Sequence, residues 1–212
     1  MVKWSKVERS LMSLLIDYLR HGEPVGGSRY RGNAIDDPLS EKGWAQMQHS
    51  TQGKIPWTRI ISSPLSRCHA FADWLGEQHQ LPVHIEDDLR EVGFGSWEGE
   101  TKQTLLASRA DEFHAFYADP VNQRPEGAEP LDQFGQRCAN VFDQLCNNYS
   151  DEHLLVVAHA GVIRATFGHV TQAPASSWYR AEVSNASITR FAVTDKLRKL
   201  IHFNCLPHGP LS

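Results

Sequence analysis

Two histidines in this 212-residue chain stand directly after apolar runs. His21 follows Arg20 and residues 14–19, His159 follows residues 154–158, and a glycine stands within two positions of each histidine. Such apolar runs are typical of buried strands, and a glycine lets the chain turn sharply where a strand ends. Ligands of α/β sheets bind at the carboxyl ends of strands. The pattern therefore predicts a site for an anion such as phosphate, although a histidine at such a turn is also commonly structural.

A second arginine stands where another apolar run gives way to a helical pattern. Residues 59–62 are typical of a short strand, and Ser63 and Pro64 suit the N-cap and first position of a helix. Arg67 then falls in the first turn, where it can bend back toward backbone N–H groups that attract anions. Taken alone, Arg67 would be a surface residue of an amphipathic helix. Together with the two histidines, it is a candidate phosphate ligand.

Residues 89–99 form a glycine-punctuated segment with two carboxylates, Glu91 and Glu98. The glycines favour a loop whose backbone approaches another part of the molecule closely. A carboxyl group in such a loop can supply the proton that a phosphoester leaving group needs. The alternative is a surface loop with solvated acids.

These four segments resemble the motifs of the histidine phosphatase superfamily, also called phosphoglycerate-mutase-like. The segments are Arg20-His21-Gly22, Ser63-Pro64-Leu65-Ser66-Arg67, the Glu91 loop and His159-Ala160-Gly161-Val162-Ile163-Arg164. They stand in the family's order, and the similarity runs from about residue 14 to about residue 191. The resemblance implies a three-layer α/β/α sandwich and a phosphoric monoester hydrolase.

The resemblance also implies a role for each candidate residue. His21 is the expected nucleophile, forming a phosphohistidine that water hydrolyses, and Glu91 is the expected proton donor. Three residues are expected to bind phosphate: Arg20, Arg67 and His159. The chemistry of these residue types agrees, because a neutral imidazole can attack an ester whose oxygens are negative. An arginine fork, in turn, bonds two phosphate oxygens at once. Glu98 is the second choice of proton donor.

Within the superfamily, the chain is most similar to the α-ribazole phosphatase type, which removes phosphate from a nucleotide-like precursor of the cobalamin lower ligand. The similarity lies in the short loop after Glu23, in residues 37–43 and in residues 94–99. It implies α-ribazole 5′-phosphate, in cobalamin biosynthesis, as the substrate. The chain departs from the family at Gly27, where the pattern often has an asparagine. Either this phosphate contact is missing, or one of Arg29, Tyr30, Arg31 and Asn33 supplies it.

Two alternatives to this substrate remain. One is a broad-specificity sugar-phosphate phosphatase or a phosphoglycerate mutase-type enzyme. Mutases of the family carry extra basic residues beyond the Glu91 loop, and residues 101–130 of this chain offer only two scattered arginines, Arg109 and Arg124. The other is a catalytically silent module that binds a phosphate ligand. Such modules usually lack one of the two histidines or two arginines, and all four are present here.

The elements that must position these residues alternate along the chain. Strands are expected at residues 14–19, 58–62, 83–85, 154–158, 186–193 and 197–204, and helices at 40–52, 64–79, 101–117, 131–149 and 162–169. This alternation predicts a mostly parallel sheet with an antiparallel edge, the last two strands forming a hairpin about Asp195. We expect one domain at 14–206, preceded by a flexible tail at 1–13.

Residues 101–130 are expected to form a helical lid over the site. The lid region ends at residues 125–127, which favour a turn. Its aromatic residues Phe113, Phe116 and Tyr117 suit a core at helical spacing. Alternatively, one or two of them pack with Trp97 on an aromatic ring of the substrate.

Composition agrees with a cytoplasmic enzyme, and the family resemblance implies a small-molecule substrate. The formal net charge of −4 at pH 7 disfavours binding to nucleic acid or to an anionic membrane, and no apolar run reaches the length of a membrane span. The first eleven residues lack the apolar centre of a secretory signal. The metal-binding motifs His-Glu-x-x-His and Cys-x-x-Cys are absent from the sequence. We therefore expect no metal and no cofactor, while a homodimer remains open.

Overall fold

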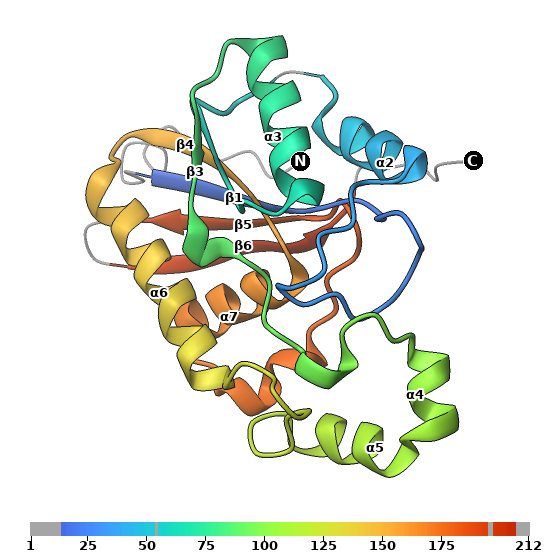
Figure 1. Cartoon of the computed structure of the whole chain (residues 1–212). Helices are drawn as coiled ribbons and strands as arrows, with labels where there is room; N and C mark the ends of the chain where they lie inside the picture. The colour runs from blue at the N-terminus through green and yellow to red at the C-terminus, as the bar shows by residue number, and fades with distance from the viewer. Residues whose placement is uncertain (1–13, 54, 195–196, 207–212) are drawn as a thin grey trace.

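A twisted sheet forms the centre of the molecule (Figure 1). The computed structural model describes residues 14–53, 55–194 and 197–206, so the tail expected at 1–13 and the turn expected at Asp195 lie outside the described residues. The sheet consists of β1 (Leu14–Arg20), β2 (Arg59–Ser62), β3 (Val83–Ile85), β4 (Glu152–Ala158), β5 (Ile188–Val193) and β6 (Arg198–Cys205). Its spatial order is β3-β2-β4-β1-β5-β6. The first four strands in this order pair in parallel, and β5 and β6 add an antiparallel edge, as the sequence predicted.

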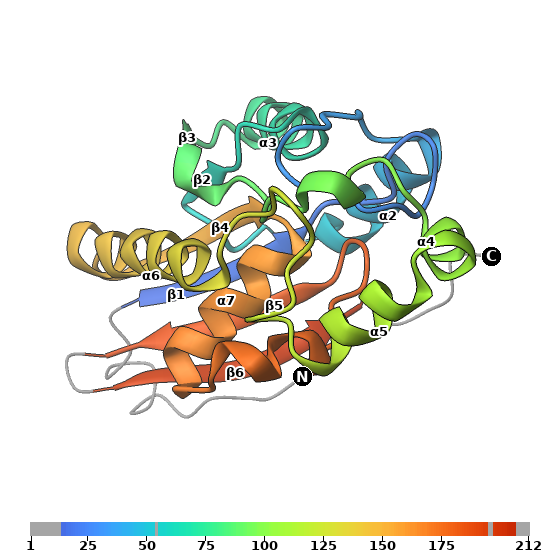
Figure 2. The ribbon, with the colours of Figure 1, turned by 60° about the horizontal axis from the view of Figure 1, so that its bottom comes forward.

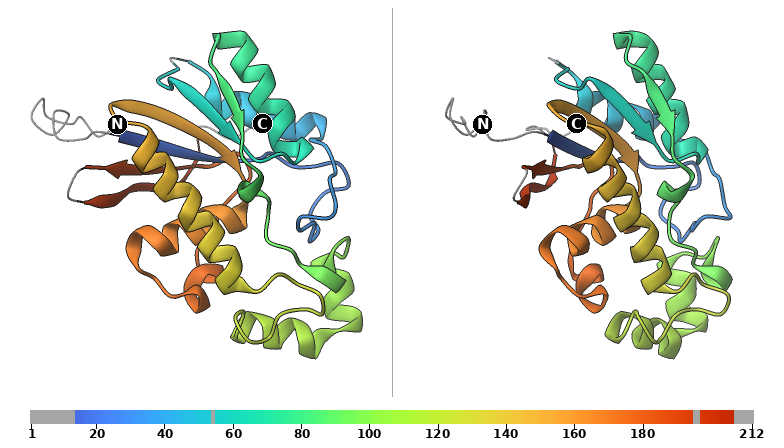
Figure 3. Two further views of the ribbon diagram at one scale, coloured as in Figure 1. Left: turned by 60° about the vertical axis from the view of Figure 1, so that its left-hand side comes forward. Right: turned by 90° about the vertical axis from the view of Figure 1, so that its left-hand side faces the viewer.

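Helices cover both faces of the sheet. The described helices are α2 (Glu41–Thr51), α3 (Ser66–His79), α4 (Lys102–Ser108), α5 (Ala110–Ala118), α6 (Leu131–Asn148) and α7 (Ala160–Thr171), with short 3-10 turns η1 (Asp87–Leu89), η2 (Gly95–Trp97) and η3 (Ala175–Arg180). The blue and teal helices α2 and α3 lie on one face, and the yellow and orange helices α6 and α7 lie on the other (Figures 1 and 3). The molecule is therefore a three-layer α/β/α sandwich, as expected.

The central strands are buried on both faces, which explains their apolar sequences. In β1, Ile16 and Tyr18 pack into the core under α6 and α7, whereas Leu19 packs into the core under α2 and α3. The same alternation applies to Val156 and Val157 of β4. Two hydrophobic cores thus hold β1 and β4 rigidly from both sides, and the carboxyl ends of these strands are fixed in space.

The helix expected at residues 101–117 is in fact two helices. The chain leaves the helical conformation at Arg109, between α4 and α5. The Arg109 side chain bonds Ser96 and Glu112, and Asp111 and Glu112 fill the acidic first turn that favours a new helix. Figures 1 and 2 show α4 and α5 to one side of the sheet, next to the chain that joins β1 to α2.

Two smaller features complete the description. A turn at residues 125–127 matches the prediction, with the Ala128 N–H donating to the Pro125 carbonyl and Gly127 at φ 72°. Among the helices of the described residues, none combines the length and apolar character that crossing a membrane requires.

Candidate active site

The two histidines singled out by the sequence lie side by side. In the parallel pairing of β1 with β4, Arg20 stands opposite Ala158, so the next residues, His21 and His159, leave the sheet together. Their ring centroids are 5.1 Å apart, and the ring planes meet at 62°. Both side chains are buried, His159 completely. The expected convergence of the two imidazoles is therefore confirmed.

The His21 ring has a defined tautomer. Its Nδ1 lies 2.7 Å from the Gly22 carbonyl oxygen, and because a carbonyl only accepts, Nδ1 carries the hydrogen. Burial, followed by the charges of Arg20 and Arg67, holds the pKa of His21 well below its ordinary value of 6.5. The ring is therefore neutral, with its lone pair on Nε2. Gly22 is required here because a Cβ would lie 2.1 Å from the Gly43 carbonyl oxygen of α2.

Two arginines hold their guanidinium groups beside His21, that of Arg67 buried and that of Arg20 partly buried. Arg20 donates from Nη1 to the Val183 carbonyl at 2.6 Å, and Arg67 donates from Nη2 to the Gly32 carbonyl at 2.9 Å. The Nε atoms of both arginines are buried without a hydrogen-bond partner among the described atoms. Burial, followed by the charge of Arg164, lowers the pKa of Arg20 to about 10. Unused buried donors on two cations are the arrangement that an oxyanion would satisfy.

Arg67 lies in the first turn of α3, but the helix begins later than the sequence predicted. Ser63 is not the N-cap: its N–H donates to Val157 and extends β2, and the helix starts at Ser66. The Ser66 N–H donates instead to Oδ1 of Asp36 at 2.7 Å. Asp36 therefore occupies the helix N-terminus that the sequence had offered to an anion.

Ser63 contacts His159 instead of capping a helix. The Ser63 hydroxyl oxygen lies 2.7 Å from Nε2 of His159, and it also accepts the Leu65 N–H at 3.3 Å. Because a serine hydroxyl both donates and accepts, either the hydroxyl or Nε2 of His159 can supply the hydrogen of this contact. Burial, followed by the charge of Arg67, holds the pKa of His159 well below 6.5. His159 contacts His21 but does not line the cavity.

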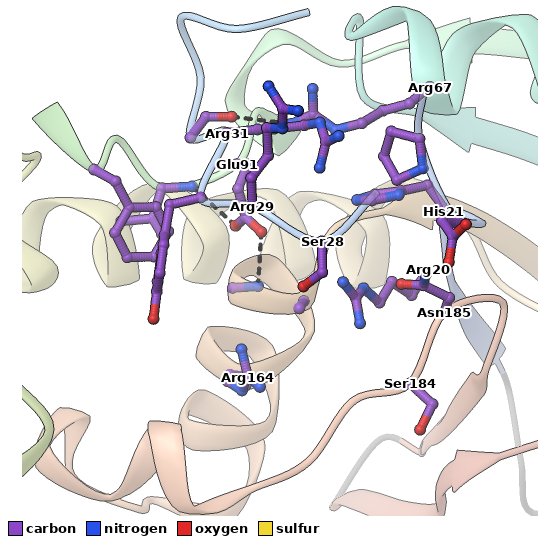
Figure 4. Close-up of a pocket in the computed structure, with 18 of the residues that line it drawn as sticks. Arg20, His21, Ser28, Arg29, Arg31, Arg67, Glu91, Arg164, Ser184 and Asn185 are labelled. Atoms are coloured by element: carbon purple, nitrogen blue, oxygen red, sulfur yellow. Dashed lines mark hydrogen bonds between the residues drawn. The ribbon is translucent and has the colours of Figure 1, made fainter. Parts of the chain in front are cut away.

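The Glu91 side chain bridges its loop to the start of α7. Oε1 accepts the Val92 N–H at 2.9 Å, and Oε2 accepts the Gly161 N–H at 3.2 Å, the bond drawn between Glu91 and α7 in Figure 4. A Cβ at position 161 would lie 2.2 Å from Oε1, so this contact requires glycine. Glu98 is engaged elsewhere, accepting the N–H groups of Phe94 and Ala34, and it does not line the cavity. Only Glu91 of the two carboxylates faces the site.

A cavity of about 550 Å³ opens at these residues, and Figure 4 shows His21, Arg20, Arg67 and Glu91 around it. One part of its lining is an aromatic wall, which consists of Tyr30, Phe94, Tyr117 and Tyr179. The hydroxyl oxygens of Tyr30 and Tyr117 are 2.7 Å apart. Tyr117 therefore lines the cavity, whereas the core interpretation had placed it with Phe113 and Phe116.

The remaining aromatic candidates belong to the core. Trp97 and Phe116 are fully buried, and Phe113 is 6% exposed. The Trp97 ring stacks on Phe113, and its Nε1 donates to Glu112 at 2.7 Å. The core interpretation is therefore confirmed for Phe113 and Phe116, and the alternative in which Trp97 packs on a substrate ring is wrong, because these two residues cover Trp97.

Residues 27–32 form another part of the cavity lining, where the sequence has Gly27 in place of the family's asparagine. Of the four candidates to replace it, Arg29, Tyr30 and Arg31 line the cavity, whereas Asn33 does not. Arg31 is already engaged, because its Nε pairs with Asp37 at 2.9 Å. Ser28 also lines the cavity and was not among the candidates.

Sequence reasoning missed three further lining residues, Arg164, Ser184 and Asn185. Arg164 stands in the segment after His159, on α7, and that placement was the available signal. Its Nε donates to the Ala181 carbonyl at 2.8 Å, and its guanidinium lies 5.5 Å from the centre of the Tyr179 ring. Ser184 and Asn185 lie in the connection before β5, whose path no sequence pattern predicted.

Within the described ranges, no three His, Cys, Asp or Glu side chains gather in a group that could hold a metal ion. The four cysteines are all free thiols, and Cys68 contacts His159 with its sulfur 3.6 Å from Nε2.

Comparison with known proteins identifies similar chains. Residues 16–206 match the family model of the histidine phosphatase superfamily (branch 1). The chain is 31% identical over 170 residues to the adenosylcobalamin/alpha-ribazole phosphatase of Salmonella typhimurium, covering 78% of this chain and 83% of that one. It is 28% identical over 204 residues to the metal-independent phosphoserine phosphatase of Arabidopsis thaliana, covering 92% and 83%. The solved structure of mycobacterial glucosyl-3-phosphoglycerate phosphatase with VO3 aligns with a TM-score of 0.79 at 28% identity, covering 90% and 98%.

Proposed function

This chain belongs to the histidine phosphatase superfamily and is a phosphoric monoester hydrolase, and we propose that His21 is the nucleophile that forms a phosphohistidine. One observation carries this proposal. The Gly22 carbonyl fixes the hydrogen on Nδ1 of His21 and leaves the lone pair on Nε2, in a neutral ring that lines the cavity. A neutral nitrogen nucleophile avoids the repulsion that an anion meets at a phosphate dianion.

The reaction takes two displacements. In the first, the Nε2 lone pair forms a bond to phosphorus, the bond from phosphorus to the ester oxygen breaks, and the Glu91 carboxyl gives its proton to that oxygen. In the second, a water oxygen attacks the phosphorus and passes a proton to the Glu91 carboxylate. The bond to Nε2 then breaks, inorganic phosphate leaves, and both residues return to their starting states.

Fixed donors meet the charge on the transferring phosphoryl group. Arg20 and Arg67 line the cavity and each have a buried Nε–H without a partner among the described atoms, while His159 packs against the His21 ring just outside the cavity lining. Because the phosphoryl transition state is loose, positioning and electrostatics supply most of the rate. We assign phosphate binding to these three residues.

The proposed substrate is α-ribazole 5′-phosphate, in cobalamin biosynthesis. The aromatic wall supports this choice, because three tyrosines and a phenylalanine offer ring faces and edges to the aromatic base of such a leaving group. The cavity volume of about 550 Å³ lies in the range of small-molecule sites. The similarity to the alpha-ribazole phosphatase of Salmonella typhimurium also supports this substrate.

Arg164 favours a second candidate, a phosphomonoester that carries a carboxylate. This arginine lines the cavity and has no carboxylate partner among the described residues. Relatives named for phosphoserine and for glucosyl-3-phosphoglycerate act on substrates of this kind. The mutase alternative lacks such support, because Arg109 bonds Glu112 and Ser96, Arg124 bonds the Gly93 carbonyl, and neither lines the cavity.

A phosphate-release panel tests the proposal. It contains α-ribazole 5′-phosphate, phosphoserine, 3-phosphoglycerate, fructose bisphosphate and nucleoside monophosphates, each assayed with a chelator present. We expect the highest kcat/KM for α-ribazole 5′-phosphate, with unchanged rates when the chelator is omitted. A higher value for phosphoserine or 3-phosphoglycerate would replace the first candidate by the second. A requirement for added metal would contradict the mechanism.

Three expectations from the sequence stay predictions. Residues 101–130 are a lid, which the contact between Tyr117 and Tyr30 supports. The chain acts in the cytoplasm, and a homodimer remains open.

A further inference from the structure

Arg137 of α6 uses every donor that a guanidinium has. Its Nε bonds Oε1 of Glu129 at 2.8 Å, and one Nη2 hydrogen bonds Oε2 of Glu129 at 2.9 Å. The other Nη2 hydrogen donates to the Glu91 carbonyl at 3.2 Å. Nη1 donates to the carbonyls of Arg90, at 2.8 Å, and of Asp88. Five N–H donors therefore meet five acceptors, and three of the acceptors are backbone carbonyls at or just before Glu91.

Glu129 holds the other side of the same loop. Its Oε2 accepts the Gly93 N–H at 3.1 Å, and its own N–H donates to the Gly93 carbonyl at 3.0 Å. The pair of Arg137 and Glu129 thus fixes the backbone before and after Glu91. Both side chains are largely buried, with 18% and 19% exposed, so the pair exchanges little with solvent.

The position of the Glu91 carboxyl depends on this backbone. Both of its oxygens accept backbone N–H groups, one from Val92 in the fixed segment and one from Gly161 of α7. A shift of the segment relative to α7 would break one bond or the other. Arg137 itself touches neither the Glu91 carboxyl nor the cavity.

We infer that Arg137, acting with Glu129, is a positioning residue that holds the Glu91 carboxyl where it can protonate the leaving group. The inference rests on the proposed role of Glu91 as proton donor. A general acid speeds departure of a basic alkoxide far more than departure of a stable anion such as p-nitrophenolate. Loss of its positioning should therefore appear selectively with alkyl substrates.

The test measures kcat/KM for p-nitrophenyl phosphate and for the best alkyl phosphate of the panel. The variant is Arg137→Lys, which keeps the charge and loses the fork. We expect kcat/KM for the alkyl phosphate to fall about 10-fold or more, a part of the ~10²–10⁴-fold that a positioned acid supplies. The value for p-nitrophenyl phosphate should change less than about 3-fold, which also shows that the variant is folded.

Arg109→Lys is the matched control. Arg109 makes a similar two-bond pair with Glu112, at 2.7 and 2.8 Å, and it bonds Ser96 farther along the same loop. It does not contact residues 88–91. We expect the ratio of the two kcat/KM values to stay unchanged in this variant.

Two results would overturn the inference. Arg137→Lys could lower kcat/KM equally for both substrates, which is the signature of a structural role, or it could lower kcat/KM for neither. Glu91→Gln, measured in parallel, separates the proposals. If Glu91→Gln lowers kcat/KM for the alkyl phosphate more than for p-nitrophenyl phosphate and Arg137→Lys does not, only the role of Arg137 is refuted. If Glu91→Gln does not discriminate, the proposed proton donor fails, and the inference about Arg137 fails with it.

Discussion

The imidazole of His21 lies edge-on against the imidazole of His159, with ring centroids 5.1 Å apart, because the strands before them end in register. Such close packing suits two neutral rings, since two imidazolium ions at this separation would repel each other. The pKa values of both rings are held low, in each case mainly by burial. The arrangement thus keeps the proposed nucleophile and a proposed phosphate donor side by side.

Replacement of His21 should abolish turnover. In His21→Ala, kcat should fall by at least about 10³-fold, because a nucleophile acts as a unit with the groups around it. Wild-type enzyme quenched during turnover should carry an acid-labile phosphoryl group that the variant lacks. His169→Gln is the control, since His169 pairs with Asp143 and lines no part of the active-site cavity. Full turnover by His21→Ala would refute the proposed nucleophile.

The protein should lose stability as the pH falls below about 6.5. His21 and His159 have pKa values well below 6.5 in the folded state, so the unfolded chain binds more protons than the folded one in this range. Each histidine should lower the free energy of unfolding by about 1.4 kcal/mol per pH unit, until the pH reaches its folded pKa. Urea unfolding between pH 7 and pH 5 measures this slope.

His21→Gln should show a shallower dependence on pH, by up to about 1.4 kcal/mol per unit. An identical slope in the variant and the wild type would show that His21 is protonated in the folded protein.

Asp17 should matter for stability and not for chemistry. This carboxylate, 1% exposed, accepts hydrogen bonds from Arg190 at 2.6 and 2.8 Å, His153 at 3.0 Å and Trp57 at 2.9 Å. Burial pushes the pKa of Asp17 upward, but the hydrogen bonds from Arg190 and His153 outweigh burial and leave the pKa at about 2. Asp17→Asn should lower the free energy of unfolding by about 3 kcal/mol, the lower end for a broken buried pair, because Arg190 is 28% exposed.

The comparison variant for Asp17 is Asp143→Asn. Asp143 is 40% exposed and pairs with Arg198 and His169, and its loss should cost less than about 1 kcal/mol. Both variants should keep the wild-type kcat for p-nitrophenyl phosphate. A fall in kcat for folded Asp17→Asn would show that Asp17 also contributes to the reaction.

Tyr117 should contribute to binding of an aromatic leaving group. The side chain is 45% exposed and stands in the aromatic wall, bonded to Tyr30. Tyr117→Ala should raise KM for α-ribazole 5′-phosphate about 3- to 10-fold, which corresponds to the energy of one aromatic contact. The KM for a small alkyl phosphate should stay unchanged. Val121→Ala, an exposed residue outside the cavity lining, serves as the control.

The sequence predicted the residues whose positions follow from strand ends. His21, His159 and Arg67 could be grouped because carboxyl ends of parallel strands meet at one edge of a sheet, and the structure confirms that grouping. Ser63 was assigned to a helix N-cap from a local pattern. Its bond to His159 depends on the pairing of β2 with β4, which no local pattern contains.

Residues on irregular segments were the hardest to predict. One alternative packed Trp97 on an aromatic ring of the substrate, but Phe113 and Phe116 of α5 cover Trp97 in the structure. Ser184 and Asn185 reach the cavity only because the chain before β5 passes beside the end of β1, where the Ala186 N–H donates to the Arg20 carbonyl. Tertiary packing, which spacing along the chain does not encode, decides both cases.

The fold places the residues proposed to act on the phosphoryl group and the residues of the aromatic wall on different segments of the chain. The residues that we assign to phosphate binding and to the nucleophile stand on strand ends and a helix start anchored in both cores, whereas the aromatic side chains come from the segment after β1, the Glu91 loop, α5 and η3. Changes in peripheral segments can redirect the enzyme toward a new metabolite without disturbing bond-making and bond-breaking. An engineer seeking altered selectivity would therefore diversify those segments and leave the anchored centre untouched.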